Sequence, residues 1–199
     1  MALANQVRMR CATAADAPEI ARLIAIAGGG IPTWLWSRMA QDGEDPLAVG
    51  AARVARPDTT FSYRNAVLAE QAGQVAGMML GYWLDRSSPG AVANLGDLPA
   101  LLRPIAELER QVTGSFYINV LAVFDGYRDY GIGTRLLQAA ASRATALGCT
   151  QLSAQTFSRN IGAVRLYERN GFRVLDSRRI EPHPSHPHDD RILLMLRAL

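Results

Sequence analysis

The sequence contains no lysine, since all 21 of its basic residues are arginine. Without lysine it cannot form the Gly-Lys-Ser/Thr end of an ATP- or GTP-binding P-loop. The 2 cysteines, Cys11 and Cys149, lie far apart without metal-ligand spacing, so neither a zinc site nor a disulfide framework is expected. No apolar run approaches the roughly 18 residues of a membrane helix. The N-terminal residues also lack a signal-peptide core, so we expect a cytoplasmic protein without a membrane partner.

The composition is that of an ordinary globular protein. Apolar residues make up 49% and charged residues 20% of the 199 residues, which predicts one domain over 1–199. The net charge of +3 is spread along the chain and indicates no nucleic-acid partner. The predicted elements alternate between strand and helix, and they favour an α/β fold. We expect a mixed central sheet of about six to seven strands flanked by helices.

Periodicity and turn residues locate these elements. Strands are predicted over 7–10, 61–70, 75–84, 116–123, 149–156, 172–180 and 191–199. Helices are predicted over 17–27, from about 32, over 47–56, over 134–147 and over 160–170. Asp16 is expected to cap the first helix, with Glu19 closing a capping box. Residues 85–114 are predicted to form a partly helical insertion before the central strand 116–123.

The stretch YRDYGIGTRLL at 127–137 follows the apolar strand 116–123. Glycines at the start of a helix leave its first N–H groups accessible, which suits either a tight turn or a phosphate cradle. Gly131 and Gly133 permit close approach of a phosphate, and Arg128 can add a charged hydrogen bond. A dinucleotide-binding fingerprint would need a third glycine where Leu136 stands, so that motif is excluded.

The remaining match is R-x-x-G-x-G at Arg128, Gly131 and Gly133, which resembles the pyrophosphate-binding motif of the GCN5-related N-acetyltransferases, the GNAT family. One strand later, Asn160 opens a helix, Tyr167 follows seven residues on, and Gly-Phe comes soon after, as in that family. The order of elements is similar to the family's over 7–199. The insertion at 85–114 departs from the family's minimal pattern.

The resemblance implies acetyl-CoA as co-substrate and a primary amine of a small molecule or peptide as acceptor. The family's donor-binding positions correspond here to Leu121, Ala122, Val123, Arg128, Asp129, Tyr130, Gly131, Ile132, Gly133, Thr134 and Asn160. The strand residues would pair with the pantetheine arm, and an N–H near Val123 would stabilise the oxyanion. Tyr167 matches the family's general acid, which protonates the departing thiolate.

Each of these roles has a purely structural alternative. Tyr167 could be a core aromatic residue, and Asn160 a helix cap. The amine also needs a proton acceptor, for which Glu107, Glu109 or a water held by Asn119 are candidates. Glu70 is interpreted as a charge at the end of a hairpin.

Two other groups of residues leave alternatives open. His183, His186 and His188 match no standard zinc spacing, so we expect a solvated loop without metal, although one of them could act as base. A second group could belong to the core or line an acceptor pocket: Trp34, Trp36, Tyr82 and Trp83. A non-catalytic acyl-CoA-binding module remains the rival function. The acceptor's identity and the choice between monomer and homodimer stay open.

Overall fold

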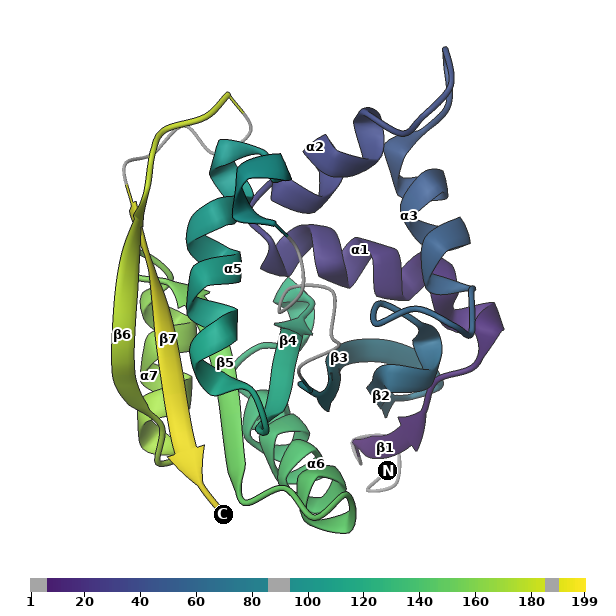
Figure 1. The fold of residues 1–199 in the computed structure, drawn as a ribbon. Coiled ribbons are helices and arrows are strands. Elements are labelled where there is room, and N and C mark those ends of the chain that lie inside the picture. The colour runs from purple at the N-terminus through teal and green to yellow at the C-terminus, as the bar shows by residue number, and fades with distance from the viewer. Residues whose placement is uncertain (1–6, 86–93, 185–189) are drawn as a thin grey trace. The chain divides into compact units, whose positions relative to one another are not determined.

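The structure is a computed structural model that describes residues 7–85, 94–184 and 190–199. Its internal contacts group the chain into two compact units. The first unit consists of residues 1–81 and 120–139, and the second of 82–119 and 140–199. The central strand β4 and the helix α6 each contribute to both units (Figure 1).

The secondary structure confirms the predicted α/β class. The strands are β1 Arg8–Cys11, β2 Ala66–Gln71, β3 Gln74–Trp83, β4 Phe116–Val123, β5 Gln151–Phe157, β6 Arg173–Ile180 and β7 Asp190–Ala198. The α-helices are α1 Ala17–Ala27, α2 Ile31–Ser37, α3 Pro46–Val54, α5 Arg103–Glu109, α6 Ile132–Ala146 and α7 Ile161–Arg169. Short 3-10 helices are η2 Ala14–Asp16, η3 Tyr63–Asn65, η4 Leu95–Asp97, η5 Ala100–Leu102, η6 Arg110–Val112 and η7 Asp125–Tyr127. The 7-stranded sheet has the order β1-β2-β3-β4-β5-β7-β6.

In the first unit, β1, β2 and β3 form an antiparallel meander. The predicted β2–β3 hairpin is confirmed, because Ala72 and Gly73 turn the chain with φ of 51° and 78°. The prediction of a strand from residue 61 is wrong for its first five residues. There, Ser62 Oγ accepts a hydrogen bond from Arg64 N at 3.2 Å, and this local turn replaces pairing with a neighbouring strand.

The predicted capping box at the start of α1 is also wrong, although the helix itself is confirmed. Asp16 accepts hydrogen bonds from Thr13 N at 2.7 Å and from Arg10 Nη2 at 2.7 Å. Arg10 also donates from Nε to Glu70 at 2.7 Å, so one guanidinium joins β1, β2 and the start of α1. Glu19 instead pairs with a residue of its own helix. The hydrogen bond from Arg10 lowers the pKa of Asp16 to about 2.

We expect Asp16→Asn to reduce the free energy of unfolding by about 2 kcal/mol at pH 7. This figure follows from the difference between the folded pKa of Asp16, about 2, and its unfolded pKa near 4. Because the folded pKa of Asp16 is depressed, its contribution is present above the unfolded pKa near 4 and is lost as pH falls through about 2. Urea unfolding at several pH values measures the difference between the two proteins. Asp58→Asn, at an exposed ion pair with Arg56, is the control and should change nothing. Equal losses in both variants would contradict this account.

In the second unit, β5, β7 and β6 are antiparallel, and β4 runs parallel to β5. The insertion is partly helical, as predicted, and its helix α5 packs against β6 and β7. Figure 1 shows α5 in front of these strands and α7 behind them. The registered β4–β5 pairs end at Ile118 and Ala154, although both strands continue. Asn119 and Gln155 therefore lie where the two strands part.

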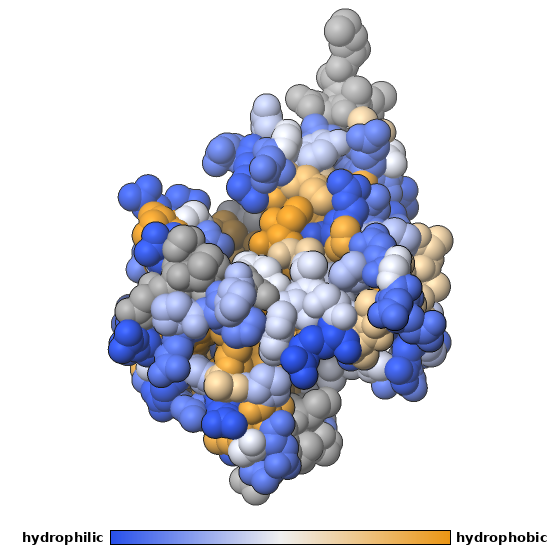
Figure 2. Space-filling view, turned by 90° about the horizontal axis from the view of Figure 1, so that it is seen from above, coloured by the Kyte–Doolittle hydropathy of each residue, from blue (hydrophilic) through white to orange (hydrophobic). Residues whose placement is uncertain are grey.

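Among the residues that the structure describes, no helix has both the length and the apolar character needed to cross a bilayer. Figure 2 shows hydrophilic residues over most of one face, with apolar residues in patches between them. Such a mixed surface is usual for globular proteins, whose accessible surface always includes apolar atoms.

Candidate active site

The last residues of β4 are Leu121, Ala122 and Val123, in the first unit. Ala122 is buried, whereas its two neighbours are half-buried. Gly77 of β3 lies against them, because a Cβ at this glycine would come within 2.7 Å of the Ala122 carbonyl oxygen. Close packing against β3 therefore holds the backbone of this segment in place.

The loop after β4 is held by short polar contacts within the first unit. Arg128 pairs with Asp125 at 2.8 Å and donates from Nε to the Val123 carbonyl at 3.3 Å. Tyr127 donates to Gln74 Oε1 at 2.9 Å. About half of the Arg128 side chain, 54%, remains exposed. A phosphate could therefore reach its guanidinium from solvent.

The loop turns into α6 through residues with left-handed backbone. Asp129 has a φ of 66° and Gly131 a φ of 75°, and Tyr130 between them is 69% exposed. Aspartate tolerates this conformation, and glycine adopts it without strain. A Cβ on Gly131 would meet no atom within 4 Å. The space in front of the loop is thus open to a ligand.

Helix α6 begins two residues earlier than predicted, at Ile132, whose side chain is buried. The N–H of Arg135 donates to the Gly131 carbonyl at 3.2 Å. In the described chain, the preceding N–H groups of Ile132, Gly133 and Thr134 have no hydrogen-bond partner. Such donors, together with the positive end of a helix dipole, can bind an anion. The residues present therefore fit the pyrophosphate of a nucleotide.

Helix α7, in the second unit, carries the Asn and Tyr of the sequence motif. Asn160 caps the helix, because its Oδ1 accepts a hydrogen bond from Ala163 N at 3.1 Å. Tyr167 is only 4% exposed, and its ring packs edge-on against Phe172 with centroids 5.1 Å apart. Its hydroxyl has no hydrogen-bond partner among the described residues. Burial raises the pKa of this phenol, so it stays protonated at neutral pH.

Tyr167 belongs to a group of ionisable side chains, here called the tyrosine–glutamate cluster: Tyr82, Glu109, Tyr117 and Tyr167. Tyr82 is half-buried, and the other three are buried. Tyr82 and Tyr117 pack edge-on with ring centroids 5.9 Å apart, and Asn119 Nδ2 donates to the Tyr82 hydroxyl at 3.2 Å. Burial raises the pKa of Tyr117 well above its usual value, and Glu109, Tyr82 and Tyr167 raise it further. The cluster thus brings together side chains from β3, α5, β4 and α7.

Comparison with known proteins assigns these features to a family. The model of the Acetyltransferase (GNAT) family matches residues 33–172, which is more than half of the chain. The chain belongs to the GNAT acetyltransferase family. The family predicted from the sequence is therefore confirmed.

Individual relatives agree with this assignment. GCN5-related N-acetyltransferase 4, chloroplastic, from Arabidopsis thaliana is 30% identical over 94 residues, which are 46% of this chain and 32% of that protein. A mosquito arylalkylamine N-acetyltransferase like 5b has a TM-score of 0.68 at 17% identity, with 98% of this chain and 100% of that chain covered. An agmatine N-acetyltransferase mutant has a TM-score of 0.67 at 15% identity, covering 97% and 99%. These structural similarities support the GNAT fold.

Two of the carboxylates singled out in the sequence, Glu70 and Glu107, have ion-pair partners within their units. Glu70 forms the ion pair with Arg10, in agreement with a role at the hairpin end. Glu107 pairs with Arg178 of β6 at 3.2 Å. Asn119 lies where the strands part, and Glu109 is buried in the tyrosine–glutamate cluster.

The tryptophans divide between core and surface. Trp36 is buried, and a Cβ on Gly50 would come within 2.7 Å of its ring. Trp34 is half-buried, and the Arg38 guanidinium lies 5.3 Å from its ring centroid. Trp83 is 55% exposed, so the core interpretation is wrong for this residue.

Of the three histidines, only His183 is among the described residues, and His186 and His188 lie outside them. Within residues 7–85, 94–184 and 190–199, no group of three or more His, Cys, Asp or Glu side chains could hold a metal ion.

The sequence pattern did not single out two polar residues of this region, Tyr117 and Gln155. Tyr117 was counted within an apolar run, although its hydroxyl distinguished it from its neighbours. Gln155 was assigned only to a strand. In the structure its Nε2 donates to the Ile105 carbonyl at 3.0 Å, while its buried Oε1 has no partner. Polar residues in otherwise apolar strands were the signal that could have identified both.

Proposed function

We propose that this protein transfers the acetyl group of acetyl-CoA to a primary amine of a small molecule or peptide. The observation that supports this most directly is the open, glycine-lined loop at the start of α6, with its three unpartnered N–H groups. The exposed Arg128 beside it adds the positive charge that a pyrophosphate requires.

Each remaining donor-binding residue has a role in this proposal. Asp129 to Thr134 shape the loop around the pyrophosphate. Leu121 to Val123 offer backbone groups to the two amides of the pantetheine arm, and an N–H near Val123 stabilises the oxyanion. Asn160 orients α7 as its cap and also contacts the arm.

Tyr167 acts in this proposal as the general acid. The neutral amine attacks the thioester carbonyl, and the tetrahedral intermediate collapses with breakage of the carbon–sulfur bond. The phenol donates its proton to the departing thiolate, and it recovers a proton from the nitrogen as the amide forms. A buried, protonated phenol without a partner can make this donation without first breaking another hydrogen bond.

The choice of an amine acceptor has support from the relatives. Two structural relatives are named for arylalkylamine and agmatine, which are both cationic amines at neutral pH. A proton must therefore leave such a substrate before it can attack.

Acetyl-CoA at about 100 times its dissociation constant should raise Tm by roughly 5–10 °C, which corresponds to about 2.7 kcal/mol of binding linkage in a chain of this size. A thiol-release assay should then detect turnover with agmatine, 2-phenylethylamine or a short peptide with a free amine. Omission of the amine is the control for hydrolysis. A rise in Tm without any turnover would favour the acyl-CoA-binding module, and no change in Tm would overturn both functions.

A further inference from the structure

Helix α5 ends in a largely buried carboxylate, Glu109, which has no partner among the described residues. Glu109 is 8% exposed, and it forms no hydrogen bond or ion pair with the described residues. Buried carboxylates are normally paired, because removal of the charge from water is costly. An unpaired one therefore indicates a ligand or a proton as its missing partner.

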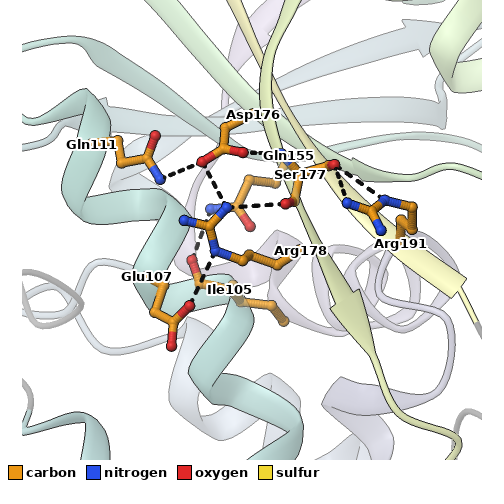
Figure 3. Close-up of polar contacts among 8 residues, drawn as sticks. All are labelled: Ile105, Glu107, Gln111, Gln155, Asp176, Ser177, Arg178 and Arg191. Carbon is orange, nitrogen blue, oxygen red and sulfur yellow. Dashed lines mark hydrogen bonds and ion pairs between the residues drawn. The ribbon is translucent and has the colours of Figure 1, made fainter.

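Glu107, two residues earlier on the same helix, differs from Glu109 because it is more exposed and forms an ion pair. Its side chain is 42% exposed and pairs with Arg178, which also binds Asp176 at 2.7 Å (Figure 3). Gln111 donates to the same Asp176 at 2.8 Å. These contacts lie at the exposed edge between α5 and β6, and Glu109 takes no part in them.

Among the described residues, the titratable group that interacts with Glu109 lies on β4, and α5 also packs against β6 and β7. Tyr117 of β4 lies close enough for Glu109 to raise its pKa, and Tyr82 and Tyr167 lie near Tyr117 in turn. Tyr117 and Tyr167 are neutral at physiological pH, because burial raises the pKa of both phenols. The charged groups of β6 that meet α5, Asp176 and Arg178, are paired with each other and with Glu107 or Gln111. No cation of the described residues pairs with Glu109, and burial raises the pKa of its carboxyl to about 7.

A second unpartnered acceptor lies beneath the same helix. The Nε2 of Gln155 donates to the Ile105 carbonyl of α5, and its buried Oε1 lacks a donor (Figure 3). The register pairs Tyr117 with Ser153, so Asn119 and Gln155 continue on the same face of the sheet. A carboxylate, an amide oxygen and tyrosine rings together suit an ammonium group, with its N–H donors and positive charge.

We propose that Glu109 binds the acceptor's ammonium group and takes the proton that must leave before attack. This assignment rests on the proposed function and adds the proton acceptor to it. The ammonium loses one proton to Glu109, which later releases it to solvent. The second nitrogen proton replaces the one that Tyr167 gives to the thiolate. Each turnover thus yields one amide, one thiol and one solvent proton.

The test compares Glu109→Gln with Glu107→Gln in the thiol-release assay, using agmatine or 2-phenylethylamine. At pH 7.5, kcat/KM should fall about 10²-fold in Glu109→Gln, the scale of a lost general base. Glu107→Gln, which removes only an exposed ion pair, should stay within about twofold. The wild-type kcat/KM should rise with pH through about 7, because Glu109 must be ionised to accept the proton. This inflection should disappear in Glu109→Gln and persist in Glu109→Asp.

Misfolding can be separated from loss of the proton acceptor. The amide of Glu109→Gln carries no charge, so its Tm at pH 8 should equal or exceed that of the wild type. Equal kcat/KM and equal pH profiles in wild type and Glu109→Gln would overturn the assignment while leaving acetyl transfer intact. If the wild-type protein acetylates no amine at all, the proposed function fails, and the role of Glu109 fails with it.

Discussion

Replacement of Tyr167 by phenylalanine is expected to lower kcat about 10²-fold or more, the usual scale for loss of a general acid. The thiolate would then leave without a nearby proton donor. The KM for acetyl-CoA should change little, because the loop at the start of α6 would still bind the pyrophosphate. Steady-state kinetics with acetyl-CoA and the best amine measure both quantities.

The stability of Tyr167→Phe serves as an internal check. The Tyr167 hydroxyl has no partner in the described chain, so its removal breaks no protein hydrogen bond. The ring can still pack on Phe172. The Tm should therefore stay within a few degrees of the wild type. Tyr63→Phe, far along the chain in η3, is the matched control and should retain full kcat. A Tyr167→Phe variant with wild-type kcat would exclude the general-acid role.

Replacement of Gly131 by valine should weaken acetyl-CoA binding about 10- to 100-fold, which equals the loss of roughly one charged hydrogen bond to phosphate. The new side chain would enter the open space in front of the loop, where no atom lies within 4 Å of its Cβ. The left-handed backbone, with φ of 75°, should also cost about 1–2 kcal/mol of stability. Titration of acetyl-CoA by calorimetry and urea unfolding separate the two effects.

Two other glycines provide controls for this prediction. Gly148 has nearly the same φ, 74°, with open space around its Cβ position, and it follows α6. Gly148→Val should lose about as much stability as Gly131→Val, but its affinity for acetyl-CoA should be unchanged. Gly126 lies in the loop itself with negative φ, and Gly126→Ala should affect neither quantity. If Gly148→Val weakens acetyl-CoA binding as much as Gly131→Val does, the cradle interpretation fails.

Local signals in the sequence predicted much of the fold. The hairpin turn at Ala72 and Gly73, the cap at Asn160 and the start of α1 depend on residues only a few positions apart. Such short-range preferences are fixed by backbone sterics and nearby hydrogen bonds. The same reasoning failed at Asp16, because Arg10, which strand pairing also holds against Glu70, binds its carboxylate.

The candidate site divides in the same way. The sequence by itself determined the glycine loop with Arg128 and the helix that carries both Asn160 and Tyr167. These motifs consist of closely spaced residues with characteristic backbone requirements. The sequence also indicated Glu107 and Glu109 as equal candidates for the proton acceptor. Only the tertiary structure distinguished them. Arg178, 71 residues along the chain, pairs with Glu107, whereas the fold buries Glu109 near Tyr117 of β4. Whether a carboxylate is buried and whether it forms an ion pair depend on such distant residues. Burial and ion pairing in turn decide which carboxylate is available to accept a proton.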